Sequence, residues 1–120
     1  MLRLKLSTGV ILAALVAVLA VTPMAVARMH AAAATTVTVK ASEFKFVLSK
    51  KTAPHGVVAF KVTNKGHIAH DFKIAGKKTP MLKPGKSATL KVTLKKGSYK
   101  YICTVPGHAA AGMRGAFKAT

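Results

Sequence analysis

Apolar and polar residues alternate with a period of two from Thr35 to the end of the chain, and this alternation constrains the fold more than any other feature. Seven apolar rows can be followed: Val37, Val39 and Ala41; Phe44, Phe46 and Leu48; Val58, Phe60 and Val62; His70, Phe72 and Ile74; Ala88, Leu90, Val92 and Leu94; Tyr99, Tyr101, Cys103 and Val105; Met113, Gly115, Phe117 and Ala119. Successive side chains of a β-strand point to opposite faces, so each row is typical of a strand with one buried face. The sequence therefore predicts seven short strands.

The breaks between these rows contain residues that favour turns. They are Pro54-His55-Gly56, Asn64-Lys65-Gly66, Lys83-Pro84-Gly85, Lys96-Gly97-Ser98 and Pro106-Gly107. Glycine, proline and asparagine supply the backbone angles that tight turns need. Many short strands with turns at nearly regular spacing, and no convincing helical period, indicate an antiparallel β-sandwich or small barrel. We expect a single domain over residues 35–120.

Composition limits the chemistry that this domain can perform. The chain has 120 residues, 51% of them apolar, and 20 basic against 2 acidic residues, which gives a formal charge of +18. So much apolar surface argues against a disordered basic tail. Glu43 and Asp71 are the only carboxylate side chains, which nearly rules out paired-carboxylate hydrolysis and oxygen-ligated Mg²⁺ or Ca²⁺ sites. The single cysteine, Cys103, excludes an intramolecular disulfide framework and any multi-cysteine zinc or iron–sulfur site.

Residues 1–34 have the pattern of a secretory signal peptide. Arg3 and Lys5 precede an unbroken apolar run over residues 10–21, and small residues further on offer cleavage sites. We expect cleavage between about residues 27 and 34, and an exported domain that keeps 17 basic and 2 acidic residues if it starts at Thr35. Its destination is the periplasm, the cell envelope or the medium. A longer apolar segment leaves an uncleaved, membrane-tethered form as the alternative.

Four side chains that bind soft or borderline metals fall into one pattern. His70, Cys103 and Met113 share the inward parity of core residues in their own predicted strands, and His108 lies in the loop between the last two. Four residues separate Cys103 from His108, and four more separate His108 from Met113. One thiolate, two imidazoles and one thioether are the ligand set of a mononuclear blue copper centre. The sequence thus predicts one Cu(I)/Cu(II) ion held by His70, Cys103, His108 and Met113.

Each candidate ligand also has a simpler interpretation. A free cysteine is most often a small buried hydrophobic residue, and a lone inward histidine is more often an ordinary core residue. His67 is a rival for the first histidine ligand, but its parity places it on the outward face. Met81 is a rival axial ligand, which we expect instead to cover one end of the sandwich. The spacing of cysteine, histidine and methionine favours the copper interpretation.

The segments Asn64–Phe72, Tyr99–Cys103 and Cys103–Met113 resemble the corresponding parts of the cupredoxins, and the resemblance extends over residues 35–120. It implies an all-β, Greek-key antiparallel β-sandwich of about seven to eight strands that transfers electrons. In that family a mid-chain histidine is followed by cysteine, histidine and methionine on the loop between the last two strands, which matches the four candidates. Their spacing is more similar to auracyanins and rusticyanins than to plastocyanins or azurins.

These observations favour an exported one-electron carrier that is not an enzyme on its own. The alternative is a copper chaperone or storage protein of the cell envelope, but such proteins use more exposed sites rich in methionine or cysteine. An oxidase would need further copper sites built from closely spaced histidines. A protein that only binds polyanions would explain the charge but not the loop.

The expected partners follow from the charge and from the surroundings of His108. We expect redox proteins with acidic docking surfaces, together with retention by anionic cell-envelope polymers or lipid headgroups. The outer edge of His108, the only ligand on a loop, should reach solvent among small residues while His70 is buried. Nucleic acid is not expected, because export separates the chain from it and all Phe and Tyr residues fall on inward rows or next to core positions. We expect a monomer.

Overall fold

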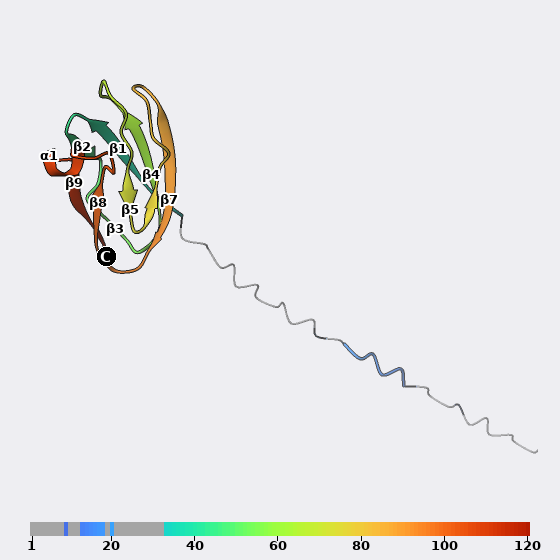
Figure 1. Ribbon diagram of the computed structural model, residues 1–120. Helices are drawn as coiled ribbons and strands as arrows, with labels where there is room; N and C mark the ends of the chain where they lie inside the picture. Colours follow the sequence, from blue (N-terminus) through green and yellow to red (C-terminus); the bar gives the residue numbers. More distant parts are fainter. Residues whose placement is uncertain (1–8, 10–12, 19, 21–32) are drawn as a thin grey trace, which may run out of the picture.

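The computed structural model describes Gly9, residues 13–18, Ala20 and residues 33–120 (Figure 1). The predicted signal peptide falls mostly outside these residues, so its cleavage stays a prediction. Within the described part of the chain, no helix combines the length and the apolar character needed to cross a membrane.

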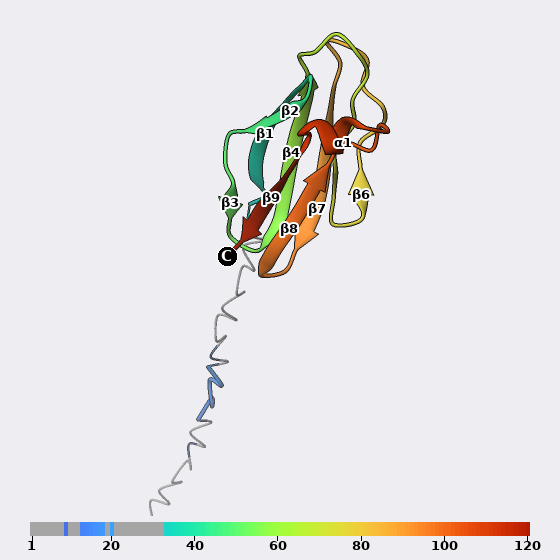
Figure 2. The same cartoon turned by 60° about the vertical axis from the view of Figure 1, so that its left-hand side comes forward.

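Nine strands and one short helix make up the domain. They are β1 (Thr35–Ser42), β2 (Lys45–Leu48), β3 (Thr52–Ala53), β4 (Gly56–Asn64), β5 (Lys73–Ile74), β6 (Lys77–Lys78), β7 (Ser87–Leu94), β8 (Gly97–Ile102), α1 (His108–Ala111) and β9 (Arg114–Ala119). One sheet has the order β2-β1-β4-β7 and the other β3-β9-β8-β5-β6, and the two form the layers of a sandwich (Figure 1, Figure 2). The predicted all-β sandwich is confirmed.

The pairing of the strands refines the predicted antiparallel arrangement. β4 pairs antiparallel with β7, and β8 with β9, but β1 pairs parallel with β4, with Val39 opposite Val62. The short strand β3 also runs parallel to β9. Between β1 and β4, which are neighbours in one sheet, the chain visits β3 in the other sheet, so this parallel pair is not a simple hairpin.

The core lies between the two sheets and is built by the predicted inward rows. Val37, Val39 and Val62 come from one sheet, Phe117 from the other, and all four are fully buried. The Phe60 ring contacts Phe117 edge to face, with 5.2 Å between the ring centroids. Period-two alternation holds along β1, whose buried residues alternate with more exposed ones. This packed core fixes the loops at the end of the sandwich where α1 lies (Figure 2).

Phe44 departs from the alternation. It was expected on the inward row of Phe46, but it is 43% exposed. The reason is local: Phe44 lies between the end of β1 and the start of β2, where the chain turns and period two has no meaning. The expected inward placement of Phe44 is therefore wrong.

Candidate metal centre

Three chain segments meet at one end of the sandwich and bring the candidate ligands together. His70 lies in the loop after β4, Cys103 directly follows β8, and His108 is the first residue of α1. The sequence placed His108 on a loop, but the backbone of residues 108–111 forms one helical turn, with the Ala111 N–H donating to the Gly107 carbonyl. His70 itself forms an isolated antiparallel bridge with Leu82.

Asn64, at the end of β4, shapes the loop that carries His70. This fully buried amide donates from Nδ2 to the carbonyl oxygens of Ile68, at 2.7 Å, and Leu82, at 2.8 Å. Its Oδ1 accepts the N–H of Gly66 at 2.8 Å. The bonds to Ile68 and Gly66 give partners to backbone groups inside the loop, and the Leu82 carbonyl also accepts the N–H of His70. The amide therefore holds this loop in place.

Asp71 joins the His70 loop to the cysteine segment. Its Oδ1 accepts the backbone N–H of Thr104 at 2.6 Å, and its Oδ2 accepts the Thr104 hydroxyl. The backbone N–H of Cys103 in turn donates to the Met113 carbonyl at 3.0 Å. The segments that carry His70, Cys103 and Met113 are therefore linked directly, which holds the site in one geometry.

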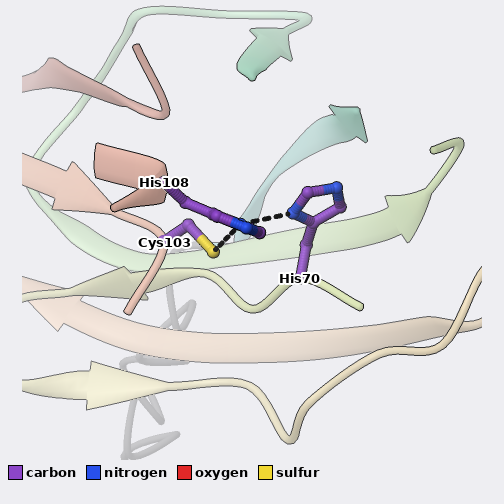
Figure 3. Close-up of side chains that lie close together, drawn as sticks. All are labelled: His70, Cys103 and His108. Atoms are coloured by element: carbon purple, nitrogen blue, oxygen red, sulfur yellow. Dashed lines mark hydrogen bonds between the residues drawn. The ribbon is translucent and has the colours of Figure 1, made fainter. Parts of the chain in front are cut away.

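The donor atoms of three candidates converge, as Figure 3 shows. Nδ1 of His108 lies 3.1 Å from Nδ1 of His70 and 3.6 Å from Sγ of Cys103. One ligand atom from each of the three residues lies within 4.8 Å of the other two. His70 and Cys103 are closed off from solvent, whereas His108 is 8% exposed. The expected contrast between the two histidines is present, but it is small because the Phe44 ring packs edge-on against the His108 ring, at 5.2 Å.

Met113 and the rival candidates fall in different surroundings. Met113 is fully buried and packs with Cys103 and Ala41 in a small apolar cluster next to the main core. Met81 is half exposed, and His67 is exposed, with its backbone N–H donating to Glu43. The structure thus brings together the predicted His70, Cys103 and His108 and buries Met113 against the cysteine.

Two residues at this site were missed by sequence reasoning, Glu43 and Phe44. Oε1 of Glu43 lies 2.9 Å from Nε2 of His70, and the Phe44 ring covers part of His108. Both lie in the turn between β1 and β2, far from the ligand segments in sequence. The available signal was the rarity of acidic residues. A single glutamate in so basic a chain indicates a specific role for its carboxylate.

Two pKa values at the site are shifted, one by burial and one mainly by the contact between Glu43 and His70. Burial raises the pKa of the Cys103 thiol above its ordinary value, so the metal-free side chain holds its proton. A bound cation reverses that preference, because a coordinating thiol is deprotonated outright. The hydrogen bond with His70 is the main reason that the pKa of Glu43 is lowered from 4.5 to about 2.

The donor set fits copper. A buried thiol and two imidazole nitrogens converge from three tied segments, and a buried thioether lies beside them. These are the ligand types of a blue copper site, and they would hold one copper ion. Such softness excludes hard cations, which prefer carboxylate and carbonyl oxygens. The arrangement accommodates a single ion.

Comparison with known proteins agrees with this geometry. Residues 26–119 match the family described as copper binding proteins of the plastocyanin/azurin family. The chain therefore belongs to this family of blue copper proteins, the cupredoxins, and copper is its cofactor. Comparison with curated protein sequences gave no match.

Solved structures share the fold. The Na-dithionite reduced auracyanin from Roseiflexus castenholzii has a TM-score of 0.64 and 24% identity, covering 73% of this chain and 98% of that one. Auracyanin A from Chloroflexus aurantiacus, described as a "blue" copper protein, gives 0.62 and 18%, covering 73% and 100%. An azurin, Az-iso2, from Methylomonas sp. strain J gives 0.58 and 18%, covering 73% and 99%. At such identities the likeness concerns the fold.

Proposed function

We propose that the protein is a one-electron carrier, not an enzyme on its own, whose copper ion would be held by His70, Cys103 and His108, with Met113 as the weakest ligand. Copper supplies a centre that alternates between Cu(I) and Cu(II), so one electron enters from a donor and leaves to an acceptor. The observation that carries the proposal is the convergence of donor atoms from three buried residues, of which His108, at 8% exposed, is the least buried.

Rigidity supports electron transfer over copper delivery. Asn64 and Asp71 tie the ligand segments by buried or partly buried hydrogen bonds, so the donor atoms need little movement when the charge of the site changes. A chaperone or store must release its metal, which favours exposed and flexible ligands. The buried Cys103 and His70 are poorly arranged for such release.

His108 is the proposed exit for the electron. The residues that follow it in α1, Ala109 to Ala111, are partly or fully exposed and too small to keep a partner away. Phe44 and Ile68, both exposed by 43%, add apolar surface from neighbouring loops. Brief contact over small and apolar residues suits a carrier that must bind and release its partners quickly.

The partner is proposed to be anionic. On the outer face of the five-stranded sheet, Lys78 pairs with Lys73, Lys73 with Ile102, and Ile102 with Arg114, which forms a single row across four strands. A surface groove beside this row is lined by Lys100, Ile102, Ala109 and Arg114, among others. Since Ile102 directly precedes Cys103, an acidic surface docked here would lie next to the site. Positive potential of this kind speeds encounter with acidic partners.

The visible spectrum tests the copper site and its ligands. Cu(II) added to the purified protein should bind one ion per chain and produce an intense thiolate-to-copper absorption band, which Cys103→Ser abolishes. Met81→Leu is the control, because this exposed methionine should leave the band unchanged. Weak absorption typical of nitrogen and oxygen ligands would contradict the ligand assignment.

Electron exchange tests the role. A reduced sample mixed with an oxidised blue copper protein should transfer electrons rapidly while the copper content of both proteins stays constant. Movement of copper to the partner without rapid electron exchange would instead identify a chaperone or a store.

We also propose that residues 1–34 direct export and are removed. Mass spectrometry of the protein from the producing cells should give a new N-terminus between about residues 27 and 34. A full-length mass in the membrane fraction would identify the tethered form.

A further inference from the structure

Glu43 makes a set of contacts that nothing in the copper chemistry so far requires. One carboxylate oxygen, Oε1, lies 2.9 Å from Nε2 of His70, 2.8 Å from the backbone N of His67 and 3.1 Å from the backbone N of Ile68. The residue lies in the turn after β1, 27 positions before the histidine that it contacts. It thus ties the β1–β2 turn to the loop that carries a ligand.

The Glu43 side chain contacts His70 rather than one of the many lysines. Across residues 33–120, which the structure describes in full, the contact of Glu43 with His70 is the only one at salt-bridge distance, although basic residues are abundant. It is an ion pair only when His70 is protonated. The other carboxylate, Asp71, is occupied by Thr104. Random placement in so basic a surface would pair a glutamate with lysine, so the observed partner calls for an explanation.

The contact decides which imidazole nitrogen is available to metal. An ionised carboxylate only accepts hydrogen bonds, so a neutral His70 must carry its hydrogen on Nε2, where Glu43 lies. Nδ1 is then left with a free lone pair, and it is Nδ1 that lies 3.1 Å from Nδ1 of His108. Fixing the tautomer and orientation of a ligating histidine through its second nitrogen is a general use of carboxylates near metals.

Gly66 leaves the space for this carboxylate. A Cβ atom at Gly66 would lie 2.2 Å from Oε1 of Glu43, closer than atoms can approach. The three nearest atoms all belong to the carboxylate group, the far end of a flexible side chain, so a methyl group here would displace Glu43 rather than the fold. Asn64 holds Gly66 in place through the hydrogen bond from Oδ1.

We propose that Glu43 is the positioning residue for His70: it holds the ring with Nε2–H toward the carboxylate and Nδ1 toward the copper ion, and its negative charge favours Cu(II) over Cu(I). The proposal rests on the copper site described above. It assigns a role to one of only two acidic residues in the chain.

The first test uses the metal-free protein, with the imidazole nitrogens observed by ¹⁵N NMR. Wild type and Glu43→Gln, which keeps one oxygen acceptor, should show His70 with its hydrogen on Nε2. Glu43→Ala and Gly66→Ala should show a mixture of both tautomers. Gly66→Ala displaces the Glu43 carboxylate but keeps its charge. It therefore keeps the test informative if Glu43→Ala fails to fold. A wild-type hydrogen on Nδ1, or a tautomer unchanged in both alanine variants, would overturn the proposal.

The second test measures copper. Loss of such an outer contact typically lowers metal affinity by about 10–100-fold, and we expect this for Cu(II) in Glu43→Ala. Glu43→Gln should weaken binding of Cu(II) more than binding of Cu(I), which raises the reduction potential. Each tenfold difference between the two losses of affinity corresponds to about 59 mV. Thr89→Lys, which makes the same charge change on the exposed side of β7, is the control and should leave both quantities close to wild type. Equal shifts in Glu43→Gln and Thr89→Lys would show that only net charge matters and would contradict positioning.

These readouts separate the proposal from the electron-carrier function. The tautomer is measured without copper or partner, so slow electron exchange in a protein with the expected tautomer would refute only the carrier role. Rapid exchange in wild type, with an unchanged His70 tautomer in Glu43→Ala and Gly66→Ala, would refute only the role of Glu43.

Discussion

Replacing Asn64 with alanine tests whether the loop before His70 is held by a single side chain. The substitution removes three hydrogen bonds, but the three partners it leaves are not equivalent. The Leu82 carbonyl still accepts the His70 N–H at 3.1 Å, and the carbonyl of the partly exposed Ile68 can bind water. The N–H of buried Gly66 loses the partner that the amide provides.

The expected loss of unfolding free energy is the sum of these three contributions. An orphaned buried donor costs about 1–3 kcal/mol, and each of the other two bonds is worth about 0.5–1.5 kcal/mol net. Asn64→Ala should therefore lower the free energy of unfolding by about 2–6 kcal/mol. For a domain of this size, each kcal/mol shifts the melting temperature by about 4–8 °C, so a fall of at least about 8 °C is expected.

Thermal and urea unfolding of the metal-free protein measure this cost, and Cu(II) titration measures its effect on the site. The matched control is Thr63→Ala, the preceding residue, whose hydroxyl bonds Ser87 on the exposed side of the sheet. We expect the control to change stability by less than about 0.5 kcal/mol. If Asn64→Ala costs less than about 1 kcal/mol and leaves Cu(II) affinity unchanged, the loop is held by other contacts and the reasoning is wrong.

Three further outcomes are expected. Met113→Leu should keep the blue colour while the reduction potential rises, because the thioether is the weakest donor; voltammetry measures this, and loss of copper would contradict it. Ala110→Glu should slow electron exchange in stopped-flow mixing without changing the spectrum, since the charge must be desolvated when a partner docks near His108. Burial raises the pKa of Tyr101, so the folded state disfavours the phenolate. Stability is therefore lost as pH rises through the folded pKa, and Tyr101→Phe should lose less stability than wild type above about pH 10.

How much of the fold can be predicted from sequence depends on how many residues of each strand show the period-two alternation. Strands of six residues or more, such as β1 and β4, repeat the alternation often enough to be recognised. The two-residue strands β3, β5 and β6 carry no period, and they exist because neighbouring strands offer them hydrogen-bonding partners. The parallel pairing of β1 with β4 depends on how the chain crosses between layers, which local sequence does not record.

The same reasoning applies to the site. Cys103, His108 and Met113 lie within eleven residues of one another, so their spacing could be read directly. Glu43 and Phe44 reach the site through space from a turn, and their side-chain directions follow from the packing of that turn against α1 and the His70 loop. Sequence predicts the candidate ligands in this protein, whereas the residues that contact His70 and His108 from the β1–β2 turn required coordinates.

The distribution of charge, rather than its amount, should decide how the protein meets its partner. Lys73 and Arg114 belong to the row on the five-stranded sheet next to Ile102, whereas Lys61 and Lys91 are exposed on the other sheet. Reversing either pair to glutamate changes the net charge equally, so the two double variants differ only in which face has changed. Since charges farther apart than about 8 Å are largely screened at physiological salt, a partner responds mainly to the face it approaches.

Electron-transfer rates with an acidic redox protein, measured over a series of ionic strengths, separate the two faces. For wild type the rate should fall as salt rises. Lys73→Glu with Arg114→Glu should slow the reaction at low salt and flatten this dependence, because the steering charges lie where the partner docks. Lys61→Glu with Lys91→Glu should stay close to wild type. Equal slowing in both variants would mean that the partner senses only net charge, and then the basic row next to Cys103 is not a docking surface.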